Sequence, residues 1–251
     1  MFKKLIVFIL CFVFIFSLSA CQKGDLTIIS SNKEAGGDQS GVPYSSDTSS
    51  EPSDPAYNID FDSWEMKLVN KWNLIHDEQA PELVNISSAY AWANDKRFDA
   101  RAIDAVTELC KAAHKDGAEL YIISAYRTDA TQTRLFNNQV NRELANNPSL
   151  TREEAEIEAA TAVARPGTSE HQLGLAVDFN SVEEDFEETK EFEWLEAHAH
   201  EFGFIMRYPK DKQDITAVIY EPWHYRYVGV ENAKLIKESG LCLEEFVELY
   251  K

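Results

Sequence analysis

The sequence predicts an α+β fold in which helices pack on an antiparallel sheet. Segments with helical apolar periodicity are mixed with short β-prone runs, without the regular strand–helix–strand spacing of a parallel sheet. The chain has 251 residues, of which 44% are hydrophobic, so it is long enough to bury a sizeable core. This length suggests one domain or two small ones, and no internal repeat is visible.

The amino terminus predicts a lipoprotein signal peptide over residues 1–20. Lys3 and Lys4 precede an apolar run over residues 5–16, and small residues follow. Residues 18–21 (LSAC) resemble the bacterial lipobox, which implies cleavage before Cys21, lipidation of its sulfur and retention at the outer face of the membrane. A plain cleaved signal, or an uncleaved anchor helix with Cys21 incidental, is the alternative.

Residues 21–57 are expected to be a disordered tether that begins at the lipidated cysteine. Residues 22–57 contain 8 Ser, 4 Gly and 3 Pro, and no apolar periodicity runs through them. A tether of this kind gives reach to a domain attached to a membrane. The chemistry is therefore expected in a single domain over residues 58–251.

The charge balance and the distribution of apolar residues exclude two broad classes of protein. The chain has 24 basic and 43 acidic side chains, a formal net charge of −19, and such a surface repels a phosphate backbone. Nucleic-acid binding is therefore not expected. Residues 5–20 form the only long apolar run, so a polytopic membrane protein is not expected either.

The first half of the domain predicts a helix, a strand and a second helix. Apolar residues recur at helical spacing over residues 99–115, and Gly117 follows as a stop signal. Residues 119–124 (ELYIIS) form a short β-prone run. A turn over residues 125–129 leads into the second helix, which includes Leu135 and Val140.

The second half alternates short helices with strands. Residues 151–154 (TREE) form a capping box that opens a helix closed by residues 165–167 (RPG). Strands are predicted over residues 175–179 and 204–208, with a helix over residues 191–201 between them. Residues 220–227 are expected to be extended, and helices over residues 232–238 and 243–250 follow.

Two cysteines within the domain leave a question open. Cys110 and Cys242 are the only candidates for a disulfide once the signal cysteine and Cys21 are set aside. Because Cys110 lies in a helical apolar pattern, a buried unpaired thiol is the alternative.

Histidines are the first residues to search for a metal site. Four of the six stand in helical or polar surroundings without a partnered carboxylate pattern and are interpreted as surface or packed residues: His76, His114, His198 and His200. The remaining two, His171 and His224, lie in a different kind of sequence.

His171 is expected on a loop, in the run SEHQLGLAVD over residues 169–178. Gly174 permits a tight turn, and Asp178 falls within an apolar strand where an unpaired carboxylate would be costly. His224 ends the run EPWH over residues 221–224, in which the proline argues against a helix. Spacing alone leaves two interpretations open: a metal site, or a salt-bridged Asp178 with core-packed histidines.

Three runs together resemble one known family. S-x-H-x-x-G-x-A-x-D over residues 169–178, E-P-W-H over residues 221–224 and S-A-Y-R over residues 124–127 are similar to motifs of the VanY-type D-alanyl-D-alanine carboxypeptidases. That family belongs to a clan of zinc peptidases that also contains lysostaphin-like endopeptidases and the hedgehog signalling domain. The resemblance covers roughly residues 65–230 and implies the α+β zinc-peptidase fold of that clan.

The resemblance also implies roles for individual residues. His171, Asp178 and His224 become ligands of Zn²⁺, with water in the fourth position. Glu221 becomes the general base, which also returns the proton to the leaving amine. Arg127 becomes the group that stabilises the tetrahedral oxyanion or orients the scissile carbonyl.

Further residues are implied to line the substrate groove. The resemblance suggests this role for four side chains: Gln132, Ser169, Tyr208 and Trp223. Ordinary alternatives are a turn former for Ser169, core aromatics for Tyr208 and Trp223, and an exposed helix residue for Gln132.

The activity implied by the resemblance is removal of the C-terminal D-alanine from peptidoglycan stem peptides, at the outer face of a bacterial membrane and facing the cell wall. An L,D-carboxypeptidase acting on tetrapeptide stems shares the catalytic set and is the first alternative. A non-catalytic wall-binding lipoprotein is the second, although a binding protein has no need of Glu221 or Arg127. The expected partners are stem peptides and the membrane, and no protein partner is evident.

Overall fold

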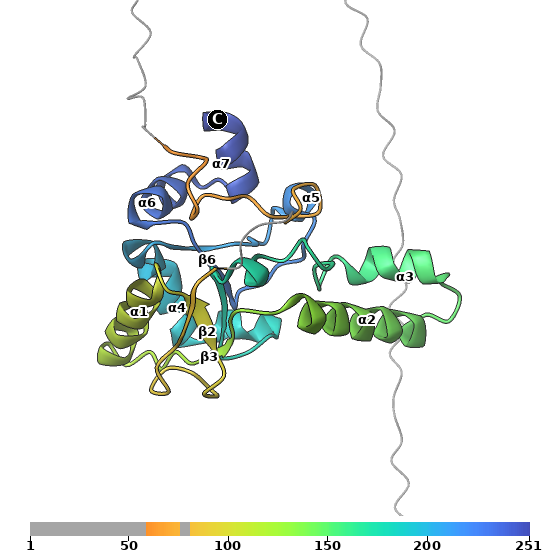
Figure 1. The fold of residues 1–251 in the computed structure, drawn as a ribbon, viewed down its shortest axis with the longest axis horizontal. Helices are drawn as coiled ribbons and strands as arrows, with labels where there is room; N and C mark the ends of the chain where they lie inside the picture. Colours follow the sequence, from red (N-terminus) through yellow and green to blue (C-terminus); the bar gives the residue numbers. More distant parts are fainter. Residues whose placement is uncertain (1–58, 76–80) are drawn as a thin grey trace, which may run out of the picture. The chain divides into compact units, whose positions relative to one another are not determined.

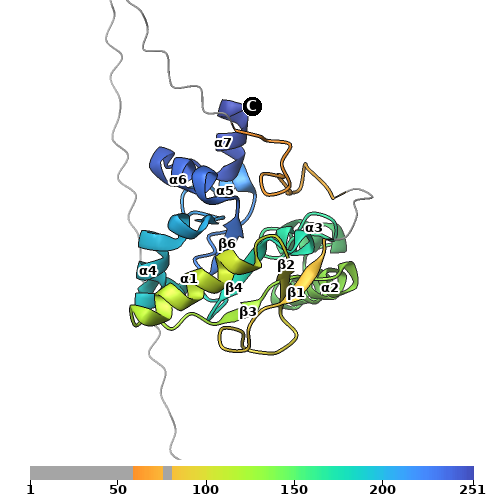
Figure 2. The ribbon, with the colours of Figure 1, turned by 60° about the vertical axis from the view of Figure 1, so that its left-hand side comes forward.

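The computed structural model describes residues 59–75 and 81–251 (Figures 1 and 2). The predicted signal peptide, lipidation site and tether, and His76, lie outside the described residues. The elements are, in chain order, β1 (Leu83–Asn85), β2 (Arg97–Asp99), α1 (Ile103–Lys115), β3 (Ile122–Ser124), α2 (Asp129–Asn146), α3 (Arg152–Ala159), η1 (Glu170–Leu173), β4 (Ala176–Phe179), η2 (Glu184–Glu188), α4 (Lys190–His198), η3 (Ala199–Phe202), β5 (Phe204–Met206), α5 (Gln213–Thr216), β6 (His224–Tyr227), α6 (Val230–Ser239) and α7 (Leu243–Tyr250).

The predicted antiparallel sheet is present, and its order is β3-β4-β6-β5. Strand β4 lies between β3 and β6, and Asp178 pairs in register with Ser124 on one side and with His224 on the other. Directly opposed residues of an antiparallel pair point to the same face of the sheet. The register therefore places Asp178 and His224 side by side on one face.

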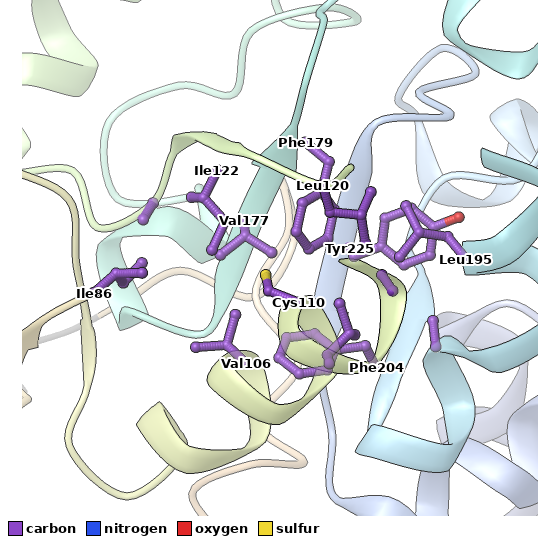
Figure 3. Packing of buried hydrophobic residues seen from close by; sticks show 14 of the residues in the cluster. Ile86, Val106, Cys110, Leu120, Ile122, Val177, Phe179, Leu195, Phe204 and Tyr225 are labelled. Atoms are coloured by element: carbon purple, nitrogen blue, oxygen red, sulfur yellow. The ribbon is translucent and has the colours of Figure 1, made fainter. Parts of the chain in front are cut away.

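The opposite face of the sheet carries the main apolar core. Figure 3 shows Val177 and Phe179 of β4 and Tyr225 of β6 meeting Val106 and Cys110 of α1. This alternation follows from the two-residue period of a strand, which sends every second side chain to the core. The same period leaves Asp178 and His224 on the other face.

Both domain cysteines are free and buried. Cys110 lies on the core face of α1, whereas Cys242 is the N-cap residue of α7. Burial raises the pKa of the Cys110 thiol to about 12, so this thiol is inert at neutral pH. Of the two possibilities left by the sequence, the structure shows unpaired thiols.

Helices α2 and α3 pack against each other and project to one side of the sheet (Figure 1). The predicted capping box is present, with Thr151 and Glu154 each bonding the other's backbone N–H. The helix that it opens ends at Ala159, earlier than the prediction of residues 165–167. The Thr161 carbonyl accepts a hydrogen bond from Ile219 N at 2.9 Å instead of continuing the helix. The backbone between α3 and η1 is therefore irregular.

A second apolar cluster joins the two ends of the described chain. Met66 packs with Ile236 of α6 and with Leu243 and Phe246 of α7. These helices lie beside the residues of the 59–75 segment in Figure 2. Residues 59–75, at the start of the predicted domain, are therefore part of its packing.

Three local differences from the sequence-based expectations concern short elements. The first helix begins at Ile103, because Asp99 is the last residue of β2 and its carboxylate bonds Arg101 instead of capping a helix. The β1–β2 pair was not predicted, since its strands have only three residues each. His171 lies on the 3-10 helix η1 and not on an open loop. Among the described residues, no helix has the length and apolar character needed to cross a membrane.

Candidate metal centre and groove

Three segments bring the predicted ligands together. Asp178 and His224 come from paired positions of β4 and β6, and His171 comes from η1. Gly174 ends η1 with φ +74°, and a Cβ on it would lie 3.0 Å from Leu83 Cδ2. The tight turn predicted at this glycine is therefore present, and it returns the chain from His171 into β4.

The three side chains offer ligand atoms within 4.8 Å of one another, and all three are buried. His224 Nδ1 lies 3.0 Å from Asp178 Oδ1, and His171 Nε2 lies 3.3 Å from Asp178 Oδ2. The imidazole rings stand nearly perpendicular, with their centroids 4.9 Å apart. Among the described residues this is the one group of histidine, cysteine and acidic side chains close enough to hold a metal.

Hydrogen bonds fix which nitrogen of His171 faces the site. Its Nδ1 lies 2.7 Å from the Ala125 carbonyl, which can only accept. Nδ1 therefore carries the proton, and the lone pair of Nε2 is left to face Asp178. A backbone carbonyl behind a ligating histidine is a common way of orienting the ring.

The charges of the three groups are set by burial and by one another. Burial and the Arg127 guanidinium lower the pKa of His171 to about 4. Burial alone would lower the pKa of His224, but the hydrogen bond to Asp178 and the Glu170 carboxylate 3.7 Å away raise it to about 9. Burial would raise the pKa of Asp178, yet His171 and Arg127 hold it well below 3.8. A metal that binds here must therefore displace a proton from His224.

Arg127 lies directly against the cluster. Its Nη2 donates to Asp178 Oδ2 at 2.6 Å, and its Nε and Nη2 donate to Ser124 Oγ at 3.0 and 2.7 Å. The backbone N–H of Arg127 also donates to the His171 carbonyl at 3.1 Å. The bonds from Nε and Nη2 hold the guanidinium, which lines the groove described below.

Glu221 lies beside His224, with Oε2 3.7 Å from Nδ1. Burial raises its pKa to about 8, an effect that the negative charge of Asp178 reinforces and the charge of His224 opposes. At this pKa the metal-free site keeps a proton on Glu221 at neutral pH, and the positive charge of a bound metal would lower the pKa toward the range in which one carboxyl group can accept a proton and then return it. This is the property that a general base needs.

A groove of about 370 Å³ opens over these residues. It is lined by Arg127, His171, Asp178, Glu221 and His224, and also by the predicted Ser169, Tyr208 and Trp223. The outer walls come from α2, from residues 162–164 and from residues 218–219: Leu135, Asn138, Gln139, Arg142, Ala162, Val163, Ala164, Val218 and Ile219. The structure thus gathers the predicted site residues in one place, with one difference.

Gln132 lies behind the wall of the groove and does not line it. It is fully buried, and its Nε2 donates to the Ala164 carbonyl at 2.7 Å. Because Ala164 lines the groove, this bond supports the wall from behind. Its Oε1 has no hydrogen-bond partner among the described residues, and contact of Gln132 with substrate stays a prediction.

Sequence reasoning missed a buried ion-pair network behind the metal cluster. Glu170 Oε1 accepts hydrogen bonds from Arg207 Nε at 2.7 Å and from Arg226 Nη1 at 2.8 Å. Arg207 also forms a two-bond pair with Glu244. Only the arginines gave a signal, since Arg207 and Arg226 stand in apolar and aromatic runs where a charge needs a partner, whereas Glu170 lies among polar neighbours.

The remaining described histidines agree with their interpretation as packed or surface residues. His114 Nε2 lies 2.7 Å from the Leu120 carbonyl, and His198 pairs with Glu201 at 3.2 Å. His200 follows α4 in η3 and joins no group of potential ligands.

The donor set fits zinc. Two imidazole nitrogens and one carboxylate are ligands that zinc prefers, and three protein ligands leave a position open, as in catalytic sites. The open side faces the groove, where Glu221 lies. A structural zinc site would instead use a fourth protein ligand.

Comparison with known proteins agrees with this geometry. The family model for VanY, D-alanyl-D-alanine carboxypeptidase, matches residues 95–230. A D-alanyl-D-alanine carboxypeptidase of Enterococcus faecalis (strain ATCC 700802 / V583) is 42% identical over 192 residues, which cover 76% of this chain and 69% of the relative.

Solved structures extend the comparison. VanYB in complex with D-alanine-D-alanine is 41% identical, with a TM-score of 0.66 over 75% of this chain and 100% of that chain. A VanY D,D-pentapeptidase variant from a VanB-type resistance cassette, in complex with Zn(II), is also 41% identical, with a TM-score of 0.65 over 74% and 99% of the two chains. The LdcB LD-carboxypeptidase is 38% identical, with a TM-score of 0.64 over 74% and 86%. This chain therefore belongs to the VanY D-alanyl-D-alanine carboxypeptidase family and is a zinc carboxypeptidase.

Proposed function

We propose that this enzyme is a D,D-carboxypeptidase that removes the C-terminal D-alanine from peptidoglycan stem peptides. The observation that carries the proposal is the opening of His171, Asp178, His224 and Glu221 into one groove. Its relative VanYB has been solved with D-alanine-D-alanine, the dipeptide that ends such a stem.

In this proposal His171, Asp178 and His224 hold zinc, which supplies Lewis acidity for hydrolysis of a peptide carbonyl. Glu221 takes a proton from the attacking water and passes it to the nitrogen of the departing D-alanine. The hydroxyl oxygen of that water joins the carbonyl carbon as the C–N bond breaks, so a shortened peptide and free D-alanine leave. The burial and raised pKa of Glu221 suit both proton transfers.

Arg127 supplies a positive charge in the groove, beside the metal ligands. Ser124 and Asp178 hold its guanidinium in place before substrate binds, so little side-chain entropy is lost on binding. It is placed to orient the scissile carbonyl or to stabilise the negative charge that develops on its oxygen.

The walls of the groove suit a short anionic peptide. Asp178 and Glu221 are its only acidic lining residues in the described structure, and Arg127 and Arg142 are both basic. The overall charge of −19 would repel an anionic stem, whereas this lining does not. Leu135, Val163 and Ile219 add apolar surface for peptide backbone and methyl groups.

Two rival functions stay distinct from this proposal. An L,D-carboxypeptidase is favoured by the similarity to LdcB, whose identity and TM-score are close to those of VanYB. A non-catalytic wall-binding protein is disfavoured by Glu221, a buried carboxyl beside the metal ligands that a binding protein does not need.

The test is to incubate the full chain with a pentapeptide stem ending in D-Ala-D-Ala and, separately, with the matching tetrapeptide, and to identify products by mass spectrometry. We expect loss of one alanine from the pentapeptide, faster by at least about tenfold in kcat/KM than from the tetrapeptide, and inhibition by a chelator. Preferential cutting of the tetrapeptide would support the L,D alternative. Cutting of neither peptide by the zinc-loaded chain would favour the binding protein.

We further propose that the enzyme is a lipoprotein held by Cys21 at the outer face of the membrane and facing the cell wall. The support is the lipobox-like run at residues 18–21 and the Ser-, Gly- and Pro-rich residues after it. Cys21→Ala should release the protein from the membrane fraction and abolish incorporation of labelled fatty acid. Equal membrane retention and labelling of this variant would contradict lipidation at Cys21.

A further inference from the structure

Two buried polar atoms face each other behind the metal cluster. His224 Nε2 and Glu170 Oε2 lie 3.7 Å apart, and neither has a hydrogen-bond partner among the described residues. Both side chains are almost completely buried. Unpaired polar atoms are costly inside a protein, so two that face each other at this distance call for an explanation.

The other oxygen of Glu170 is rigidly held. Oε1 receives hydrogen bonds from the fully buried Arg207 and Arg226. Arg207 is fixed in turn by Glu244, and Arg226 Nη2 donates to the Glu65 and Lys67 carbonyls at 2.8 and 2.9 Å. The network therefore fixes one oxygen of the carboxylate and leaves the second aimed at His224.

His224 needs an acceptor at this position if it is to bind zinc through Nδ1. Nδ1 is the nitrogen that lies beside Asp178, at 3.0 Å, so its lone pair must be free and the ring proton must sit on Nε2. His171 has the opposite arrangement, with the Ala125 carbonyl accepting its Nδ1–H. Glu170 Oε2 occupies the place behind His224 that this carbonyl occupies behind His171.

We propose that Glu170 is a positioning residue, which accepts a hydrogen bond from His224 Nε2–H and so presents Nδ1 to the zinc. A shift of roughly 1 Å or less between the two groups brings 3.7 Å to hydrogen-bonding distance. The two arginines prevent the carboxylate from turning away. The inference rests on the zinc site and not on the choice between D,D and L,D substrates.

A purely structural role makes a different prediction. If Glu170 only neutralises Arg207 and Arg226, its second oxygen has no function, and its loss should lower stability without a specific effect on zinc. Glu244 provides the matched control, because it is also an acid paired with Arg207, with a side chain only 10% exposed, but it forms no hydrogen bond or ion pair with His224. Glu170→Gln and Glu244→Gln therefore remove the same kind of charge from the same network.

The experiment measures the zinc dissociation constant of the full-length variants by competition with a chromophoric chelator, and the melting temperature of each metal-free protein. We expect Glu170→Gln to weaken zinc binding about 10–100-fold, because a glutamine cannot satisfy both the arginines and Nε2–H. Glu244→Gln should lower the melting temperature but change zinc affinity by less than about threefold. Unchanged affinity in Glu170→Gln, or an equal loss in both variants, would overturn the proposal.

A second measurement needs no substitution and so does not depend on the variants folding. In protein labelled with ¹⁵N-histidine, two imidazoles should respond to zinc, one keeping its proton on Nδ1 and the other on Nε2. The proton on Nε2 should exchange slowly with solvent, as expected for a buried hydrogen bond. If both responding imidazoles carry the proton on Nδ1, Glu170 has no proton to accept and the proposal fails.

Discussion

Glu221 combines three properties within one side chain: it is buried, it lies within 4 Å of a ligand nitrogen, and it opens into the groove. Backbone hydrogen bonds on both sides fix the position of Glu221. The backbone carbonyl of Tyr208 accepts a hydrogen bond from the Glu221 backbone N–H at 3.2 Å, and the Glu221 carbonyl accepts one from the His224 backbone N–H at 3.2 Å. The backbone of Glu221 is thereby fixed between β5 and β6, and its side chain is held beside His224.

Glu221→Gln is therefore expected to remove proton transfer while keeping shape. We expect kcat to fall by about 10²–10⁴-fold, the usual contribution of a positioned general base, with zinc still bound. The measurement is kcat and KM on the stem peptide, with zinc content determined on the same samples. A variant that retains more than about a tenth of wild-type kcat would remove Glu221 from this role.

Some residue roles could be predicted from the sequence and others could not. Asp178 could be singled out because its neighbours in the chain are apolar, which is a local signal. Glu170 could not, because its partners Arg207 and Arg226 lie 37 and 56 positions away and its effect on His224 depends on the register of β4 with β6. Pairing of distant charges is a product of topology, which no local pattern contains.

Among the elements, those with strong local signals were the ones predicted well. The amphipathic α1 and the capping box of α3 rest on periodicity and on contacts within four residues. The end of α3 and the β1–β2 pair depend instead on distant backbone hydrogen bonds, such as Ile219 N to the Thr161 carbonyl. Tertiary contacts decided those boundaries.

The turn between η1 and β4 gives a test at this scale. Gly174→Ala combines a positive φ with a Cβ only 3.0 Å from Leu83 Cδ2 and 3.3 Å from Asp99 N, so we expect a loss of about 2–4 kcal/mol in the free energy of unfolding. Gly117→Ala is the control, because its φ is +86° but nothing lies within 4 Å of the added Cβ, and it should cost about 1–2 kcal/mol. Denaturant unfolding measures both. Equal losses would show that crowding at Gly174 is unimportant.

Helix α7 is held partly by charge, which makes its docking sensitive to acid. Burial alone would raise the pKa of Glu244, but the Arg207 guanidinium and the Asn70 amide lower it below the ordinary 4.5. A lowered folded-state pKa stabilises the protein above the unfolded value and loses that contribution as the pH falls.

The free energy of unfolding of the wild type should therefore decline as the pH is lowered from about 5 through the pKa of Glu244. Glu244→Gln should show a shallower decline over the same range, because glutamine does not titrate. Urea unfolding at a series of pH values measures both slopes. Parallel curves for the two proteins would show that this ion pair contributes nothing to acid sensitivity.

For the molecule as a whole, the ion-pair network behind the site extends beyond the part that the family model matches. The match ends at residue 230, whereas Glu244 lies in α7 and bonds both Arg207 and Asn70, the latter 174 positions away. Met66 belongs to the same apolar cluster as Leu243 and Phe246 of α7. Residues from both ends of the described chain therefore contribute to the ion-pair network behind the metal cluster.

Zinc should stabilise this whole unit, because the unfolded chain has no preformed site. At a free zinc concentration about 100 times the dissociation constant, the gain is about 2.7 kcal/mol, which corresponds to a rise of about 5–11 °C in melting temperature for a domain of this size. Thermal unfolding with zinc and with excess chelator measures the difference. Identical melting temperatures would argue against a metal site that exists only in the folded state.

The α2–α3 pair has its own small cluster of Phe136, Val140, Ala155 and Ala159, separate from the core beneath the sheet. Because α2 and the chain after α3 form the outer walls of the groove, substitutions in the pair can reshape those walls while the ligands on β4, β6 and η1 stay in place. We therefore expect substitutions between α2 and α3 to change which peptides fit the groove more than they change the metal ligands. The shape of the groove and the chemistry beneath it can then vary independently.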